Sequence, residues 1–228
     1  MSLFEPAEVP CPACGAMLEF DLATSVNADR RPDLRLEILA NTFQRVACAA
    51  CGTLVRLPPA LTYMHVAKGQ WILAKPASEF ANWTQLEAIA RQTFDLAYGA
   101  AASRPAQLIG RGLRPRIVFG WAALREKLLA AEEGIDDVLL ELLKLAALRE
   151  VSGAALNDES ELRLLDADAD TLTLAWLVSE TEQELSSLQL PRSALAGIAA
   201  DTAAWAPLRA KLSAALFVDF GRLLLATA

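Results

Sequence analysis

Long uncharged runs are absent from this chain of 228 residues. The longest segment without Asp, Glu, Lys or Arg, 57–67, has only 11 residues and contains Pro58 and Pro59. Because a membrane-spanning helix needs about 20 mostly apolar residues, we expect no contact with a membrane, despite a mean hydropathy of +0.29. Basic residues are missing from the first ten positions, so the basic region that opens a secretory signal is not there. A cytoplasmic protein is therefore the expectation.

Histidine is nearly absent as well, since His65 is the only one. A single histidine without a serine or cysteine nucleophile in a recognisable pattern gives no catalytic triad. We interpret His65 as a partly buried structural residue of a strand. Neither a Walker-type phosphate loop nor a GxGxxG turn occurs. We therefore predict no catalytic residue and a protein that is not an enzyme.

Positive charge is scarce in the second half of the chain. The net charge of −7 divides into +2 over residues 1–120 and −9 over residues 121–228. A negative net charge argues against general attraction to nucleic acid. We expect the acidic half to present a surface to an unidentified protein partner, and a homo-oligomer also stays open. With 54% apolar and 21% charged residues, the composition is typical of a folded protein.

Cysteine is the residue type that carries chemistry here. The four cysteines form two CxxCG motifs with 33 residues between them: Cys11, Cys14, Cys48 and Cys51. Two residues between cysteines let both thiolates of one turn reach a single ion, and the glycine that follows can adopt a positive φ and close the turn. Structural disulfides are disfavoured without an export signal, and a thioredoxin-type motif needs only one such pair. We predict that these four cysteines bind one metal ion.

A tetrahedral site of four sulfurs accepts zinc or a single iron. Rubredoxins also hold iron in two CxxCG turns, but they are rich in aromatic residues around the metal. Here only Phe20 and Phe43 lie between the two motifs. We therefore expect Zn²⁺, one per chain, with iron as the alternative. Four protein ligands leave no open position for water or substrate, so such a site organises the fold and does not catalyse.

The hydrophobic pattern predicts an α+β fold in three parts. We expect a zinc-ribbon-like β module with both CxxC turns in residues 1–76, a helical region in 77–150 and a C-terminal α+β region in 151–228. Alternating patterns predict strands at 17–26, 42–47, 53–57, 63–67, 70–75, 162–165, 171–178 and 184–190. Helical patterns lie at 33–41, 82–98, 121–133, 137–149 and after Pro191. Gly134 and Asp136 are read as a helix end and an N-cap, which predicts an αα-hairpin.

Three charged segments have both a structural and a functional interpretation. Asp166, Asp168 and Asp170 begin like a calcium loop, but the glycine and glutamate that should follow are missing, which favours a solvated hairpin turn. The acidic segment 132–137 is interpreted as a helix end and cap. The stretch from Arg104 to Arg116 is interpreted as a mobile basic linker that docks on the acidic second half, with phosphate binding as the alternative.

The first motif, Cys11-Pro12-Ala13-Cys14, together with the strand after it, the second motif and the hairpin ending at Lys75, is similar to the bacterial CpXC-domain family. Residues 116–145 resemble the helical region that follows the cysteine module in that family, and the similarity covers about the first two thirds of the chain. Ala49 stands where the family pattern has proline. Proline supplies no metal ligand, so this difference does not affect metal binding. The resemblance implies a zinc-binding module and supplies no reaction.

Three functions remain as hypotheses. The preferred one is a non-enzymatic interaction, scaffold or adaptor protein whose zinc site is structural. The second is a nucleic-acid-binding ribbon, which needs a basic face with aromatic residues that the near-neutral first half does not offer, and for which no binding residues can be named. The third is rubredoxin-like electron transfer, which requires iron.

Overall fold

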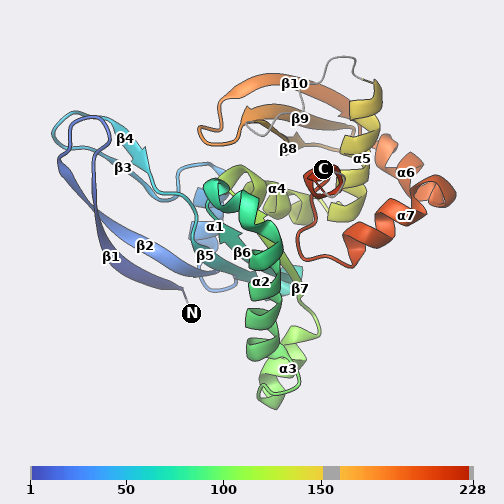
Figure 1. The fold of residues 1–228 in the computed structure, drawn as a ribbon, viewed down its shortest axis with the longest axis horizontal. Coiled ribbons are helices and arrows are strands. Elements are labelled where there is room, and N and C mark those ends of the chain that lie inside the picture. The colour runs from blue at the N-terminus through green and yellow to red at the C-terminus, as the bar shows by residue number, and fades with distance from the viewer. Residues whose placement is uncertain (1, 151–159, 226–228) are drawn as a thin grey trace.

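A computed structural model describes residues 2–150 and 160–225, and it has the mixed α+β architecture that the sequence predicts (Figure 1). The strands are β1 (Leu3–Pro10), β2 (Met17–Asn27), β3 (Arg45–Ala47), β4 (Leu54–Arg56), β5 (Leu61–His65), β6 (Gln70–Lys75), β7 (Arg114–Phe119), β8 (Ser160–Ala167), β9 (Thr171–Val178) and β10 (Glu184–Pro191). The α-helices are α1 (Pro32–Leu39), α2 (Trp83–Tyr98), α3 (Arg104–Gly110), α4 (Trp121–Glu132), α5 (Asp137–Glu150), α6 (Ser193–Ala200), α7 (Thr202–Ser213) and α8 (Gly221–Leu225). Short 3₁₀ helices occupy Val66–Lys68 and Ala77–Asn82. Within the described residues, each helix is too short or too polar to cross a bilayer.

The larger sheet has the strand order β1-β2-β5-β6-β7 (Figure 1). Its strands send alternate side chains into two cores. Ile72 and Ala74 of β6 lie in the core that α1 and α4 complete, whereas Trp71 lies in the core that α2 completes. This alternation follows from the two-residue period of a strand. α1 and α4 therefore cover one face of the sheet, and α2 covers the other.

Helix α4 lies between the larger sheet and the smaller sheet, whose strand order is β10-β9-β8. Leu124 and Leu128 pack in the core of the larger sheet, while Ala122 packs against Ala175 of β9. The opposite face of β9, with Leu174, packs in a core with α5, α6 and α7. A helix that is apolar on several sides is expected to be surrounded by other elements. α4 is thus the central element of the molecule.

The helix pair expected around Gly134 is confirmed. Gly134 has φ +64°, and Asp136 Oδ1 accepts hydrogen bonds from the amides of Val138 and Leu139 at 3.0 and 3.1 Å. These are the helix end and the N-cap that the sequence indicates. The leucines of α4 face the larger sheet mainly and those of α5 face the smaller one, so the pair connects the two sheets.

The expectation of a mobile linker over 104–116 is wrong, because α3 and β7 occupy most of it. β7 pairs in parallel with β6, so the larger sheet contains a strand from outside residues 1–76. Only the second half of β7 is apolar and buried. The arginines in its first half interrupt the hydrophobic pattern by which a strand is recognised in the sequence. Pro115 is tolerated because β7 is an edge strand. The docking part of the prediction holds for Arg116, whose Nε lies 2.7 Å from Asp137 Oδ2.

Most predicted strands are confirmed with ends that differ by a few residues, but β1 was not expected. β1 is largely exposed and carries Pro6 and Pro10, which weaken a strand pattern; it is tolerated at the edge of the sheet, paired with β2. The acidic turn between β8 and β9 is a hairpin turn as predicted. Its Asp168 Oδ1 accepts hydrogen bonds from the amides of Asp170 and Thr171 at 2.8 and 2.7 Å.

Candidate metal centre

Two hairpins carry the cysteines, and their turns have the same backbone structure. The first turn joins β1 to β2 and the second joins β3 to β4. The Cys11 amide donates to Ala16 O at 2.8 Å and the Gly15 amide donates to Cys11 O at 2.8 Å. The corresponding bonds in the second turn, Cys48 N to Thr53 O and Gly52 N to Cys48 O, measure 2.8 and 2.7 Å. The repeated CxxCG sequence therefore folds into two matching turns.

The glycine after each CxxC motif is required by the backbone. Gly15 has φ +76° and Gly52 has φ +74°, a left-handed conformation that other residues adopt only with strain. A Cβ at either position would meet no heavy atom within 4 Å, so the constraint is the backbone angle and not the available space. Each glycine turns the chain so that both cysteines of the motif point to the same side.

The four sulfurs form a compact cage. Their Sγ atoms all lie within 4.8 Å of one another; Cys11 Sγ is 3.7 Å from Cys51 Sγ, and Cys14 Sγ is 3.6 Å from Cys48 Sγ. A tetrahedron with Zn–S bonds of about 2.3 Å has sulfur–sulfur edges of about 3.8 Å. The observed separations match that value and are far from the roughly 2.05 Å of a disulfide. The cage can hold one tetrahedral ion.

One sulfur pair of the cage faces the protein and the other faces solvent. Cys11 and Cys48 are 2% exposed, whereas Cys14 and Cys51 are exposed. The buried pair packs against Leu18 and Phe20 in a small apolar cluster between the two hairpins. In Figure 1 these hairpins project from the rest of the molecule as an arm, with the turns at its far end. The apolar cluster is small, so an ion between the turns would add substantially to what holds the arm together.

Crowding of the thiols perturbs their titration. The hydroxyl and amide of Thr53 lower the pKa of Cys51 to about 6, and Thr53 Oγ1 lies 3.2 Å from Cys51 Sγ. At Cys14 the amide of Ala16 lowers the pKa, but the neighbouring Cys51 and Cys48 sulfurs raise it to about 12. Neighbouring thiolates repel one another, so not all four ionise together without a cation. A metal ion is the species that resolves this competition, because it binds thiolates.

The other candidate ligands do not assemble into a second site of this kind. Over residues 2–150 and 160–225, the geometry that suits a metal ion is found at Cys11, Cys14, Cys48 and Cys51 and not at the acidic segments 132–137 or 166–170. His65 is partly buried; burial lowers its pKa, and its Nε2 lies 3.8 Å from Asp29 Oδ1. The centre is thus made of sulfur alone.

The fold and the cage define a mixed α+β protein with a cluster of four cysteines in its N-terminal β region that could hold a metal ion. The model of the CpXC protein family matches residues 9–144, which is more than half of the chain, and the chain belongs to this family. The match begins two residues before Cys11 and ends within α5, so β8, β9 and β10 lie beyond it. Neither a curated protein nor a solved structure matches the chain.

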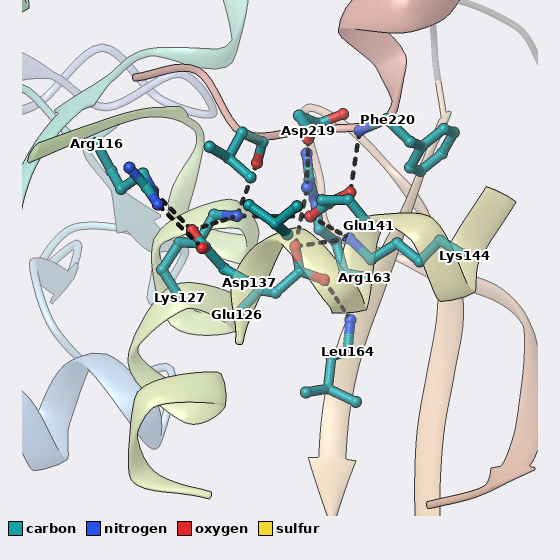
Figure 2. Close-up of polar contacts among 12 residues, drawn as sticks. Arg116, Glu126, Lys127, Asp137, Glu141, Lys144, Arg163, Leu164, Asp219 and Phe220 are labelled. Carbon is teal, nitrogen blue, oxygen red and sulfur yellow. Dashed lines mark hydrogen bonds and ion pairs between the residues drawn. The ribbon is translucent and has the colours of Figure 1, made fainter. Parts of the chain in front are cut away.

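A buried network of charges is the feature that the sequence did not indicate (Figure 2). Glu126 Oε1 of α4 accepts hydrogen bonds from Lys144 Nζ of α5 at 2.7 Å and from Arg163 Nη1 of β8 at 3.2 Å, and its Oε2 accepts one from the amide of Leu164 at 2.6 Å. Arg163 Nη1 also donates to Asp219 Oδ2 at 2.7 Å. The network therefore ties α4, α5 and β8 to the segment that precedes α8.

Among the residues that the structure describes, carboxylates outnumber cations in this network. Its carboxylates are Glu126, Asp137, Glu141, Glu161 and Asp219, and its cations are Arg116, Lys127, Lys144 and Arg163. Burial raises the pKa of Glu141 to about 7, above the 4.5 of a free side chain. The positive charges of Lys144 and Lys127 lower this pKa but offset the effect of burial only in part. Both Glu141 oxygens accept hydrogen bonds, from Lys144 Nζ and from the Phe220 amide, each at 3.0 Å. The available signal was weak: Arg125, Glu126 and Lys127 interrupt the apolar residues of α4, as Glu141 and Lys144 do in α5.

Proposed function

We propose that the four cysteines bind one Zn²⁺ per chain as a structural site. The observation that carries this proposal is the cage itself, whose sulfur–sulfur separations of 3.6 and 3.7 Å equal those of a tetrahedral zinc–thiolate centre within about 0.2 Å. The apolar cluster beside the sulfurs contains a single aromatic residue, Phe20. Because the surroundings of the sulfurs contain few aromatic residues, they support zinc over the iron of rubredoxin-like proteins.

A structural role for the ion follows from its ligand set. Four cysteine sulfurs occupy all four coordination positions of a tetrahedral ion, so neither water nor substrate can bind the ion without displacing a ligand. The charge at the centre would be −2 with four thiolates. Such a site stabilises the two turns and holds β1–β2 against β3–β4. We therefore propose a non-enzymatic protein that acts by presenting surfaces to a partner.

The surface that we assign to a protein partner is the acidic face formed by the turn between β8 and β9, at one end of the smaller sheet. Asp166, Asp168 and Asp170 at this turn are all exposed. Exposed carboxylates of one sign attract a basic partner and raise its association rate. This face lies in the region that carries the −9 charge. A basic protein is thus the partner of our proposal.

Metal analysis tests the zinc site. We expect one zinc per chain in purified protein, a colourless solution, and loss of zinc in Cys14→Ser. Ala13→Ser places the same hydroxyl in the same turn at an exposed position that offers no ligand, and it should keep its zinc. A red protein with one iron per chain would overturn the zinc assignment, and full zinc content in Cys14→Ser would overturn the cage.

Charge neutralisation tests the partner surface. The triple variant Asp166→Asn, Asp168→Asn, Asp170→Asn should lose partners that wild-type protein retains from a lysate at low salt, and the retained set should consist of basic proteins. Retention of DNA or RNA that weakens with salt would instead favour the nucleic-acid alternative. An identical set of proteins retained by the triple variant would contradict the acidic-face proposal.

A further inference from the structure

The strands that carry the second CxxC turn hold two arginines directly opposite each other. Arg45 of β3 and Arg56 of β4 are partners in the antiparallel ladder. Like charges at such cross-strand positions repel each other and destabilise the pair. A third arginine, Arg125 of α4, lies close enough to lower the pKa of Arg56. The fold therefore gathers three guanidinium groups at the base of the metal-binding arm.

The partly buried carboxylate of Glu182 opposes these three charges. Glu182, in the turn between β9 and β10, places Oε2 3.0 Å from Arg125 Nη1 and 3.3 Å from Arg56 Nη1. Glu182 has φ +58°, a left-handed backbone that glutamate rarely adopts. Glycine or asparagine suits such a position better, so the local backbone does not explain glutamate there. The ion pairs of its carboxylate with Arg56 and Arg125 explain why glutamate occupies this position.

Two guanidinium nitrogens nevertheless have no partner. Arg45 Nε and Arg56 Nη2 are buried and donate to no acceptor within the described residues. In that same part of the chain, the Arg45 side chain makes no hydrogen bond or ion pair. Burial, together with Arg45 and Arg125, lowers the pKa of Arg56 to about 10, and Glu182 opposes this only in part. A charged donor without an acceptor is unfavourable, so the Arg45 side chain would gain from an acceptor supplied from outside the chain.

A cleft of about 300 Å³ opens at these arginines. Arg45 and Arg56 line it from the arm, Gly120 and Trp121 line it from the start of α4, and residues 179–182 line it from the turn between β9 and β10. Its volume is at the lower end of the range for small-molecule sites. Glu180 is exposed and adds a second carboxylate to the lining. Its lining therefore holds two arginines and two carboxylates, and Arg125, which lies outside the lining, pairs with Glu182.

We propose that this cleft binds the phosphate group of a small anion, with Arg45 and Arg56 as its main ligands. Guanidinium groups donate paired hydrogen bonds that match the oxygens of phosphate. The Arg56 guanidinium already lies over the Trp121 ring, 4.5 Å from its centroid, and donates to Phe43 O at 3.2 Å, so its position is fixed before any ligand binds. A bound phosphate would give the Arg45 guanidinium an acceptor and relieve the repulsion between the two arginines. This inference does not depend on which metal the cysteines hold.

Arg45→Gln is the decisive variant, because the Arg45 side chain has no hydrogen-bond or ion-pair partner among residues 2–150 and 160–225 to lose. Without phosphate, we expect the variant to be as stable as the wild type or more stable, since one repulsive charge is gone. With inorganic phosphate, the wild-type melting temperature should rise while that of Arg45→Gln should stay nearly constant, and calorimetry should show binding to the variant weakened by roughly tenfold or more. Arg114→Gln removes an equally charged but 74% exposed side chain outside the cleft and should bind phosphate as the wild type does.

The source of the phosphate is distinguished by comparing ligands on metal-loaded, full-length protein. Inorganic phosphate, a sugar phosphomonoester and the unphosphorylated sugar are titrated at matched ionic strength with chloride as the control salt. Tighter binding of the phosphomonoester assigns the cleft to an organic phosphate, and equal binding assigns it to free phosphate. Glu182→Gln should tighten binding of either, because it removes the competing carboxylate. The proposal is overturned by absence of saturable binding at millimolar phosphate, or by equal binding to wild type and Arg45→Gln.

Discussion

Lys144 Nζ lies 2.7 Å from Glu126 Oε1, and neither side chain has any exposed surface. The two residues come from adjacent helices that pack against different sheets. Glu126 has further bonds to Arg163 and to the amide of Leu164, so the carboxylate is fully satisfied. A buried pair of this kind contributes little net stability compared with apolar side chains, but removing one partner leaves an uncompensated buried charge. The pair therefore fixes how α4, α5 and β8 fit together.

Lys144→Met should destabilise the protein severely. Methionine fits the space but leaves Glu126 and Glu141 without the ammonium group that both contact. We expect the free energy of unfolding to fall by about 3–5 kcal/mol, measured by urea denaturation. Lys68→Met is the control, because Lys68 is 36% exposed and its pair with Glu132 should be worth less than about 1 kcal/mol. Equal losses in the two variants would show that the buried network is not a unit.

Glu141 should make stability depend on pH. Burial raises its pKa in the folded protein to about 7, above the 4.5 of the unfolded chain. Its contribution is therefore fully present below about pH 4.5 and is lost as the pH rises through about 7. Glu141→Gln should remove this loss, so the difference between variant and wild type should change by up to about 3 kcal/mol over that interval. Urea denaturation at several pH values measures it, and parallel curves for the two proteins would contradict the assignment.

Removal of the metal should loosen the arm and leave the sheets intact. The amides of Cys11, Gly15, Cys48 and Gly52 are held by turns that the ion would brace. After treatment with a chelator, we expect these amides to exchange hydrogen rapidly, while those of β6, which is paired on both edges, stay protected. Residues 1–76 should not unfold as a whole, because β5 and β6 belong to the core completed by α4. Unchanged protection at both turns would argue against a structural ion.

Two glycines should respond to alanine with opposite signs. Gly134 has φ +64°, so Gly134→Ala should cost about 1 kcal/mol through backbone strain. Gly197 lies inside α6, where a Cβ meets nothing within 4 Å, and Gly197→Ala should stabilise by about 0.5–1 kcal/mol. Both free energies come from urea denaturation of otherwise identical proteins. Stabilisation by Gly134→Ala would mean that the turn between α4 and α5 is not left-handed in solution.

The cysteine cage could be predicted because its information is local. A CxxCG motif specifies its own turn through short-range hydrogen bonds and one left-handed glycine, and two identical turns imply a common ion. The N-cap at Asp136 was predictable for the same reason. β7 was missed because its arginines are accounted for by ion pairs with Asp136 and Asp137, which follow more than 20 positions later in the sequence. The local sequence of a strand does not show which distant residues its side chains will contact.

The charge network was missed for a related reason. Glu126, Lys127, Glu141 and Lys144 are the residues that a helical pattern assigns to solvent, because charged side chains are almost never fully buried unless paired. Their pairing depends on Arg163 and Asp219, which reach them only after the smaller sheet and the C-terminal segment have packed on α4 and α5. Burial of a charge is therefore a property of the assembled fold and not of one helix.

The second CxxC turn lies within the connection that carries the chain from β2 to its parallel neighbour β5. Parallel strands cannot meet until such a connection closes, and closure costs entropy that slows folding. An ion that joins Cys11 and Cys14 to Cys48 and Cys51 draws the middle of this connection back to the start of β2. The metal should therefore act on the rate of folding as well as on the folded state. Stopped-flow refolding should be faster with zinc present from the start than with zinc added afterwards.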